Sequence, residues 1–169
     1  KIVNAAKQEG ISAIIASDQA VISFASSINM EVHISTQTNI TNLETIRFYS
    51  HFADVVVLSR ELSLGQVKAI TKDIKKQQIK GPSGNLMQIE IFAHGALCMA
   101  VSGKCYLSLH TTNSSANRGA CIQNCRKTYT VTDTEDGHQF EIDNEYIMSS
   151  KDLCTIGFLD QVLDAGTRI

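Results

Sequence analysis

An alternation of short apolar runs with amphipathic segments constrains this chain more than any other feature. Apolar runs begin near residues 11, 31 and 54, and each is followed by a segment with helical periodicity. Their spacing of about 20 to 23 residues leaves room for a helix in each connection, as parallel strands require. The alternation therefore predicts an α/β fold with a parallel sheet.

Further signals extend this pattern in both directions. The expected helices are 18–29, 42–52, 62–79 and 155–166. Asp18 is the expected N-cap of the first of them, and a fourth strand is expected within 86–95, after the only proline. The chain begins as the middle of a helix and stops where another strand would begin. We therefore expect it to be the central part of a longer fold.

The architecture that fits this order is the central part of a TIM-like (β/α) barrel. We interpret residues 1–169 as a fragment of a single catalytic barrel domain. Between 95 and 150 the alternation breaks, because a Cys-rich loop is followed by a β-hairpin with its turn at Asp136 and Gly137. An open doubly wound sheet has the same alternation, although no phosphate-binding glycine pattern follows the first strand. In both folds ligands meet the carboxyl ends of the strands.

Polar residues follow the expected strands at these ends. They are Asp18, then Ser35, Thr36 and Gln37, then Ser59, Arg60 and Glu61, then His94 and Gly95. We select Gln37, Arg60, Glu61 and His94 as candidate catalytic residues, because carboxyl ends of parallel strands share one edge. Structural roles are the alternatives: Arg60 and Glu61 as a surface ion pair, and His94 as the cap of a strand. His33 lies inside a strand, where a core position is expected.

The charge balance limits the classes of partner. The chain has 15 basic and 17 acidic residues, a formal charge of −2, so no overall field attracts nucleic acid or an anionic membrane. Binding of RNA would need a local basic patch. No apolar run reaches the roughly 18 residues of a transmembrane helix, and the amino end lacks a secretory signal pattern. We expect no membrane association and a cytoplasmic location, unless a targeting segment lies outside this chain.

Cysteine is the residue type with the most informative distribution. The five cysteines are Cys98, Cys105, Cys121, Cys125 and Cys154. In a cytoplasmic protein this clustering favours metal or cluster ligation over disulfides. No Cys-x-x-Cys pair occurs, which argues against a structural zinc finger. An iron-sulfur cluster needs four ligands and close backbone approach, which a Gly-rich loop permits. Bound zinc, free buried thiols and a catalytic thiol with His94 as its base are alternatives.

Cationic side chains lie beside these cysteines in the sequence. The segment NRGACIQNCRK, residues 117–127, contains Arg118, Arg126 and Lys127. Such cations bind an anionic substrate or offset the charge of a cluster. We select Asn117, Arg118 and Arg126 as candidate substrate-binding residues, with an anionic cosubstrate as a possible ligand.

Five segments together resemble a known family. They are HISTQTNITN, VVLSREL, HGALCMAVSGKCYLS, NRGACIQNCRK and SSKDLCTIGFLDQVLDAG, in the family's order and across nearly the whole chain. The family is that of the collagenase-like proteases, peptidase family thirty-two among those of unknown catalytic type, which includes RNA and ubiquinone hydroxylation proteins. The resemblance implies a TIM-like barrel, of which this chain would be a central part.

The resemblance also implies a [4Fe-4S] cluster. The ligands that it implies are Cys98, Cys105, Cys121 and Cys154, with Cys125 as the alternate. The choice between Cys121 and Cys125 stays open. Two residues depart from the family pattern: Asn124 stands where proline is common, and Lys104 where arginine is common. Both changes are expected to loosen the local geometry without removing a ligand.

Two functions follow from the resemblance. In the first, the protein adds a hydroxyl group to a pyrimidine of tRNA or rRNA, with His94 orienting the cluster and Arg60, Arg118 and Arg126 contacting phosphate or the anionic cosubstrate. In the second, it hydrolyses peptides, which requires an activated nucleophile. Neither a Gly-x-Ser-x-Gly nor a His-Glu-x-x-His motif occurs in the chain. We expect an RNA hydroxylation enzyme, with a peptidase as the alternative.

Overall fold

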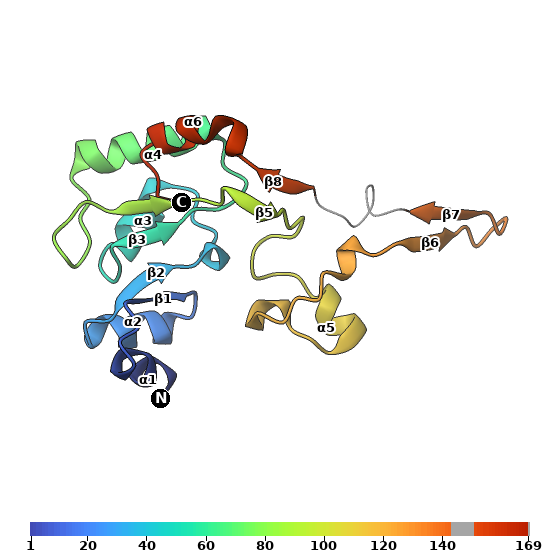
Figure 1. The fold of residues 1–169 in the computed structure, drawn as a ribbon, viewed down its shortest axis with the longest axis horizontal. Coiled ribbons are helices and arrows are strands. Elements are labelled where there is room, and N and C mark those ends of the chain that lie inside the picture. Colours follow the sequence, from blue (N-terminus) through green and yellow to red (C-terminus); the bar gives the residue numbers. More distant parts are fainter. Residues whose placement is uncertain (143–150, 169) are drawn as a thin grey trace. The chain divides into compact units, whose positions relative to one another are not determined.

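The computed structural model describes residues 1–142 and 151–168, which fall into two compact units (Figure 1). The first unit contains Lys1–Ala93 and Thr155–Ile169, and the second contains His94–Cys154. The chain therefore leaves the first unit once and returns to it once. Of the predicted polar strand ends, those from Asp18 to Glu61 belong to the first unit, whereas His94, Gly95 and all five cysteines belong to the second.

Four parallel strands form the sheet of the first unit, in the order β1-β2-β3-β4. They are β1 Ala13–Ala16, β2 Glu31–Ile34, β3 Val55–Val57 and β4 Gln88–Glu90. After the last helix, Arg168 forms a further parallel bridge with Glu90 and its N–H donates to the Ile89 carbonyl at 2.6 Å. The α/β prediction is thus confirmed, with parallel strands that follow one another in chain order.

Helices precede, connect and follow these strands. They are α1 Ile2–Gln8, α2 Gln19–Ser27, α3 Leu43–Tyr49, α4 Leu64–Gln77 and α6 Leu159–Asp164, with 3₁₀ turns η1 Thr36–Thr38 and η4 Ile156–Phe158. Of these, α2, α3 and α4 form the three connections that the spacing of the apolar runs predicted. The Asp18 side chain accepts a hydrogen bond from the Val21 N–H at 2.9 Å, so the predicted N-cap is confirmed. In the described residues no helix is long and apolar enough to cross a membrane.

The two faces of the sheet differ in chemistry. Successive residues of a strand point to opposite faces, and Val32, Ile34, Val56 and Ile89 pack with the helices into one hydrophobic core. The opposite face, called here the polar face, carries Ile15, Glu31, His33, Val55, Val57, Gln88 and Glu90. His33 is thus in a strand as expected, but on the face away from the main core.

The second unit contains short elements. They are β5 His94–Ala96, α5 Leu107–Thr112, η2 Ala116–Arg118, η3 Asn124–Arg126, β6 Tyr129–Thr132, β7 Gln139–Ile142 and β8 Asp152–Cys154. Strands β6 and β7 pair antiparallel as the predicted hairpin, with Gly137 at a φ of 78°. The fourth parallel strand is shorter than expected: it ends at Glu90, and His94 belongs instead to β5, opposite Cys154 of β8.

Candidate active site

The carboxyl ends of β1 and β2 are joined by side chains. Ser17 follows β1, and its hydroxyl donates a hydrogen bond to Oε1 of Gln37 at 3.0 Å. Gln37 lies in the η1 turn, and its backbone N–H donates a hydrogen bond to the Ser35 hydroxyl at 3.2 Å. The turn holds the predicted site residue Gln37 at the edge of the sheet where ligands bind in parallel α/β folds.

The carboxyl end of β3 presents a second polar group. Ser59 is 6% exposed, and its hydroxyl donates a hydrogen bond to the Glu61 carboxylate. Arg60, which separates them in the sequence, is half-buried. The backbone N–H of Ser59 donates to the Ile40 carbonyl at 2.9 Å, which fixes this strand end to the segment that follows β2. Gln37, Arg60 and Glu61 thus lie at strand ends of the first unit, whereas His94 is an exposed residue of the second.

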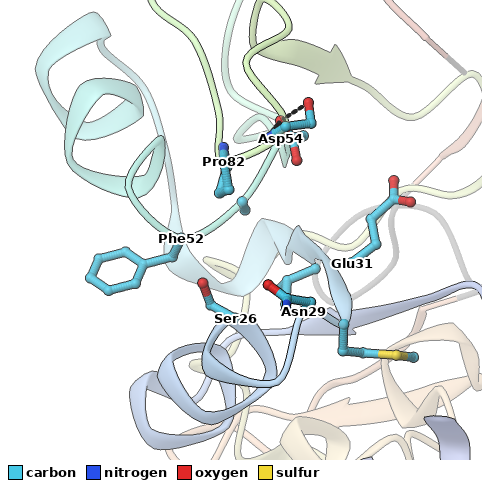
Figure 2. A pocket seen from close by; sticks show the side chains of 10 residues that line it. Ser26, Asn29, Glu31, Phe52, Asp54 and Pro82 are labelled. Atoms are coloured by element: carbon cyan, nitrogen blue, oxygen red, sulfur yellow. Dashed lines mark hydrogen bonds between the residues drawn. The ribbon is translucent and has the colours of Figure 1, made fainter.

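A pocket of about 310 Å³ lies at the other end of the same sheet (Figure 2). It is lined by Glu31, the first residue of β2, and by residues that precede β2, β3 and β4, among them Asn29, Asp54 and Pro82. The Asp54 carboxylate accepts hydrogen bonds from the Ser83 hydroxyl at 2.6 Å and the Ser83 N–H at 3.1 Å. Because catalytic sites of parallel α/β folds lie at the carboxyl ends, we do not assign the reaction to this pocket.

Four thiols gather in the second unit. Cys98 and Cys121 are exposed, whereas Cys105 and Cys125 are half-buried. Burial raises the pKa of the Cys125 thiol, the neighbouring charges of Cys98, Cys121 and Cys105 raise it further, and a backbone hydrogen bond lowers it. Thiols that influence one another's ionisation in this way lie close together. Cys125, expected as an alternate ligand, is therefore part of the group.

Cysteine sulfur is a ligand both of mononuclear metal sites and of iron-sulfur clusters. In residues 1–142 and 151–168, no three His, Cys, Asp or Glu side chains are arranged so that they could hold one metal ion. Around a tetrahedral zinc the sulfurs converge on one centre, each at about 2.3 Å. In a [4Fe-4S] cluster each cysteine binds a different iron, so its sulfurs lie further apart. The donor atoms present, all of them cysteine sulfurs, are of the type that a cluster requires.

Buried polar side chains position the loop that carries these thiols. Ser108 of α5 is 1% exposed; its hydroxyl accepts the Ile122 N–H at 3.3 Å and lies 4.0 Å from the Cys121 sulfur. Asn124 is 3% exposed, donates to the Thr111 hydroxyl, and its carbonyl accepts from the Tyr129 hydroxyl. Asn124 is thus held by hydrogen bonds to Thr111 and Tyr129. Sequence reasoning missed Ser108 and Thr111, because small polar residues in a loop carry no distinctive signal.

The predicted substrate-binding residues have different environments. The Arg126 guanidinium donates to the Asp152 carboxylate at 2.6 Å, which links η3 to β8. Arg118 is exposed at the end of η2, where Asn117 is half-buried. Cys154, an implied ligand, lies in β8 opposite His94. Arg118 is therefore the better placed of the two arginines to meet an anion from solvent.

The sequence profile of peptidase family U32 matches residues 1–169. The chain belongs to peptidase family U32. This match confirms the resemblance drawn from the motifs. No solved structure matches the chain.

Curated relatives of the U32 chain carry two kinds of name. A protein named collagenase from Porphyromonas gingivalis is 59% identical over 99% of this chain and 41% of its own length. A 23S rRNA 5-hydroxycytidine synthase of Escherichia coli is 36% identical over 95% of this chain and 23% of its own length. A tRNA hydroxylation protein of Bacillus subtilis is 32% identical over 92% of this chain and 36% of its own length. The chain thus spans less than half of each of these relatives.

Proposed function

We propose that this chain is the central part of a barrel enzyme that holds a [4Fe-4S] cluster and hydroxylates pyrimidines in RNA. The observation that carries the proposal is the gathering of Cys98, Cys105, Cys121 and Cys125 in one loop region, close enough for their charges to interact. The hydroxylation proteins among the relatives support the same reading. Strands in chain order support the barrel, since a doubly wound sheet reverses its order at a switch point.

Three of the ligands in this proposal are Cys98, Cys105 and Cys121, and the fourth is Cys125 or Cys154. When bound, the cluster supplies electron transfer. The protein contributes its own groups around it. Ser108 and Asn124, both buried, fix the backbone that carries Cys121 and Cys125.

Anion binding is the second part of the proposal. Exposed Arg118 would contact an RNA phosphate or an anionic cosubstrate, because a guanidinium offers two parallel N–H donors to such oxygens. Arg126 would have to exchange Asp152 for the anion. With a formal charge of −2, the chain would bind RNA through local cations such as these. A cytoplasmic location accompanies this proposal as a prediction.

A peptidase is the second candidate, because the relative that is 59% identical is named collagenase. Its nucleophile would be Ser59, whose hydroxyl donates to the Glu61 carboxylate. A carboxylate in that position can accept the proton of a serine that attacks a carbonyl carbon. Ser59 also lies at the carboxyl end of β3, where substrates meet a parallel sheet.

The decisive experiment uses the full-length protein purified without oxygen, and RNA from cells that lack or express its gene. We expect about four irons per chain and matching sulfide, together with a hydroxylated pyrimidine that disappears with the gene. Both should be lost in Cys105→Ala, whereas Ser59→Ala should keep the full iron content, because Ser59 lies outside the unit that carries the cysteines. Cleavage of a collagen peptide that is lost in Ser59→Ala, in a protein without iron, would instead establish the peptidase.

Comparison of two single variants tests the fourth ligand. Because Cys125 belongs to the group of interacting thiols, we expect Cys125→Ala to lose most of the iron and the visible absorbance of the cluster. Cys154→Ala serves as its matched control and should retain the larger part. The reverse order of the two iron contents would assign the fourth position to Cys154.

A further inference from the structure

His33 bridges two carboxylates on the polar face of the sheet. Its Nε2 lies 3.2 Å from Oε1 of Glu31 on β2, and its Nδ1 lies 3.1 Å from Oε1 of Glu90 on β4. Neighbouring strands are about 4.8 Å apart, so the contact with Glu90 crosses the full width of β3. Val55 and Val57 occupy that strand on the same face. The apolar surface beneath the imidazole therefore consists of two buried valine side chains.

The carboxylates in contact with His33 differ in their exposure to water. Its side chain is 15% exposed, that of Glu90 is 20% exposed, and that of Glu31 is 46% exposed. On the β1 side the neighbour in register is the apolar Ile15. Beyond Glu90, Arg168 donates to Gln88 at 2.6 Å. Glu31 is therefore the carboxylate that exchanges protons with water readily, whereas His33 and Glu90 are more sheltered.

The two ring nitrogens face different ends of the sheet. Glu31 is the first residue of β2 and lines the pocket at the amino ends of the strands (Figure 2). Glu90 is the last residue of β4, at the carboxyl end. A neutral imidazole has one N–H and one acceptor nitrogen, and it donates at both only when protonated. The ring is therefore placed to accept a proton on one side and release one on the other.

We propose that Glu31, His33 and Glu90 form a proton relay from solvent at the amino ends of the strands to the reaction site at their carboxyl ends. In a single transfer an N–H bond forms at Nε2 with a proton from Glu31, while the N–H bond at Nδ1 breaks and an O–H bond forms at Glu90. Water then protonates Glu31 again, and the ring returns to its Nδ1–H form by exchanging protons with water before the next transfer. The electron pairs stay on nitrogen and oxygen, so one proton moves and nothing is oxidised or reduced. The inference rests on the proposed function in taking the carboxyl ends as the place of reaction.

Substitution of the ring tests the relay in the full-length protein. His33→Gln should lower the turnover rate by about a hundredfold or more, the usual contribution of a positioned acid or base. His51→Gln is the matched control, since His51 is exposed on the surface and its Nδ1 faces only the Phe48 carbonyl. Glu31→Gln should also slow turnover, because it removes the proton donor and leaves the imidazole of His33 in place. Its control, Glu44→Gln, removes an exposed carboxylate that pairs with Arg47 and should have no effect.

Chemical rescue separates a relay from a structural tie. In His33→Ala, free imidazole added to the assay should restore a large part of the rate, because it can carry the proton through the vacated position. Folding of each variant is checked by circular dichroism. A rate unchanged in His33→Gln, or a loss in folded His33→Ala that imidazole does not restore, would overturn the relay. If wild-type protein hydroxylates no pyrimidine, the proposed function fails, and the same loss and rescue are then expected in cleavage of a collagen peptide.

Discussion

Gly81 is the residue at which the backbone leaves no room for a side chain. A Cβ atom there would lie 2.7 Å from Cα of Asp54 and 2.8 Å from the Ala53 carbonyl oxygen, in addition to meeting the Asp54 carboxylate. Two of these three atoms belong to the backbone, which cannot move aside as a flexible side chain can. We expect Gly81→Ala to lower the free energy of unfolding by about 1–3 kcal/mol, as overpacked sites do. Urea denaturation of the full-length protein measures this difference.

Gly65 provides the matched control for Gly81. It lies in the first turn of α4, where the nearest atom to an added Cβ is the Ser63 hydroxyl oxygen at 4.0 Å. Gly65→Ala should leave stability unchanged or raise it by about 0.5–1 kcal/mol, because alanine has the higher helix propensity. Equal losses in the two variants would mean that the close approach at Gly81 has no energetic role.

Single residues also show where sequence reasoning reached its limit. Asp18 was identified as an N-cap because the pattern that defines it is local. His33 was expected in the core, yet it contacts Glu90, which lies far along the chain on another strand. Such a contact depends on the register of three strands. No local pattern encodes that register, so the polar face could not be predicted from the residues alone.

Helix α4 begins with a capping box, in which two residues of its first turn exchange hydrogen bonds. The Ser63 hydroxyl accepts the Gln66 N–H at 3.4 Å, and the Gln66 side chain accepts the Ser63 N–H at 2.8 Å. We expect Ser63→Ala to cost about 1 kcal/mol of stability, because N–H groups of the first turn lose a partner. Ser23→Ala, at an exposed position within α2, should change stability by no more than about 0.5 kcal/mol. Thermal unfolding followed by circular dichroism compares them.

Secondary-structure elements were predicted correctly where an apolar pattern repeats over a long segment. Short strands were predicted less well. The helices and the order of the parallel strands follow from apolar runs that recur along the chain. The segment 86–95 was expected as one strand because it is apolar and ends in glycine. It divides at Glu90, since His94 pairs with Cys154 from beyond the hairpin. The partner of a three-residue strand cannot be inferred from its own sequence.

At the scale of the whole molecule, the thiol-bearing unit is inserted into the α/β unit through two adjacent strands. His94 of β5 pairs with Cys154 of β8, and the Thr155 N–H donates to the Ala93 carbonyl at 3.0 Å. Paired antiparallel residues have Cα atoms about 5 Å apart, so both ends of the insertion meet at one place. Because the insertion starts and ends at neighbouring positions, it can be removed without stretching the flanking residues of the first unit.

This geometry predicts the effect of removing the insertion from the full-length protein. Residues 95–153 are replaced by Asn-Gly, which closes an antiparallel pair with a tight turn. Because no described residue of the second unit belongs to the hydrophobic core of α2, α3, α4 and the four parallel strands, we expect the protein to stay monodisperse and helical by circular dichroism. It should bind no iron even after anaerobic reconstitution, since every cysteine of this chain except Cys154 is removed. Aggregation of the shortened protein would mean that the α/β unit requires the insertion to fold, whereas retained iron would place the cluster on residues outside this chain.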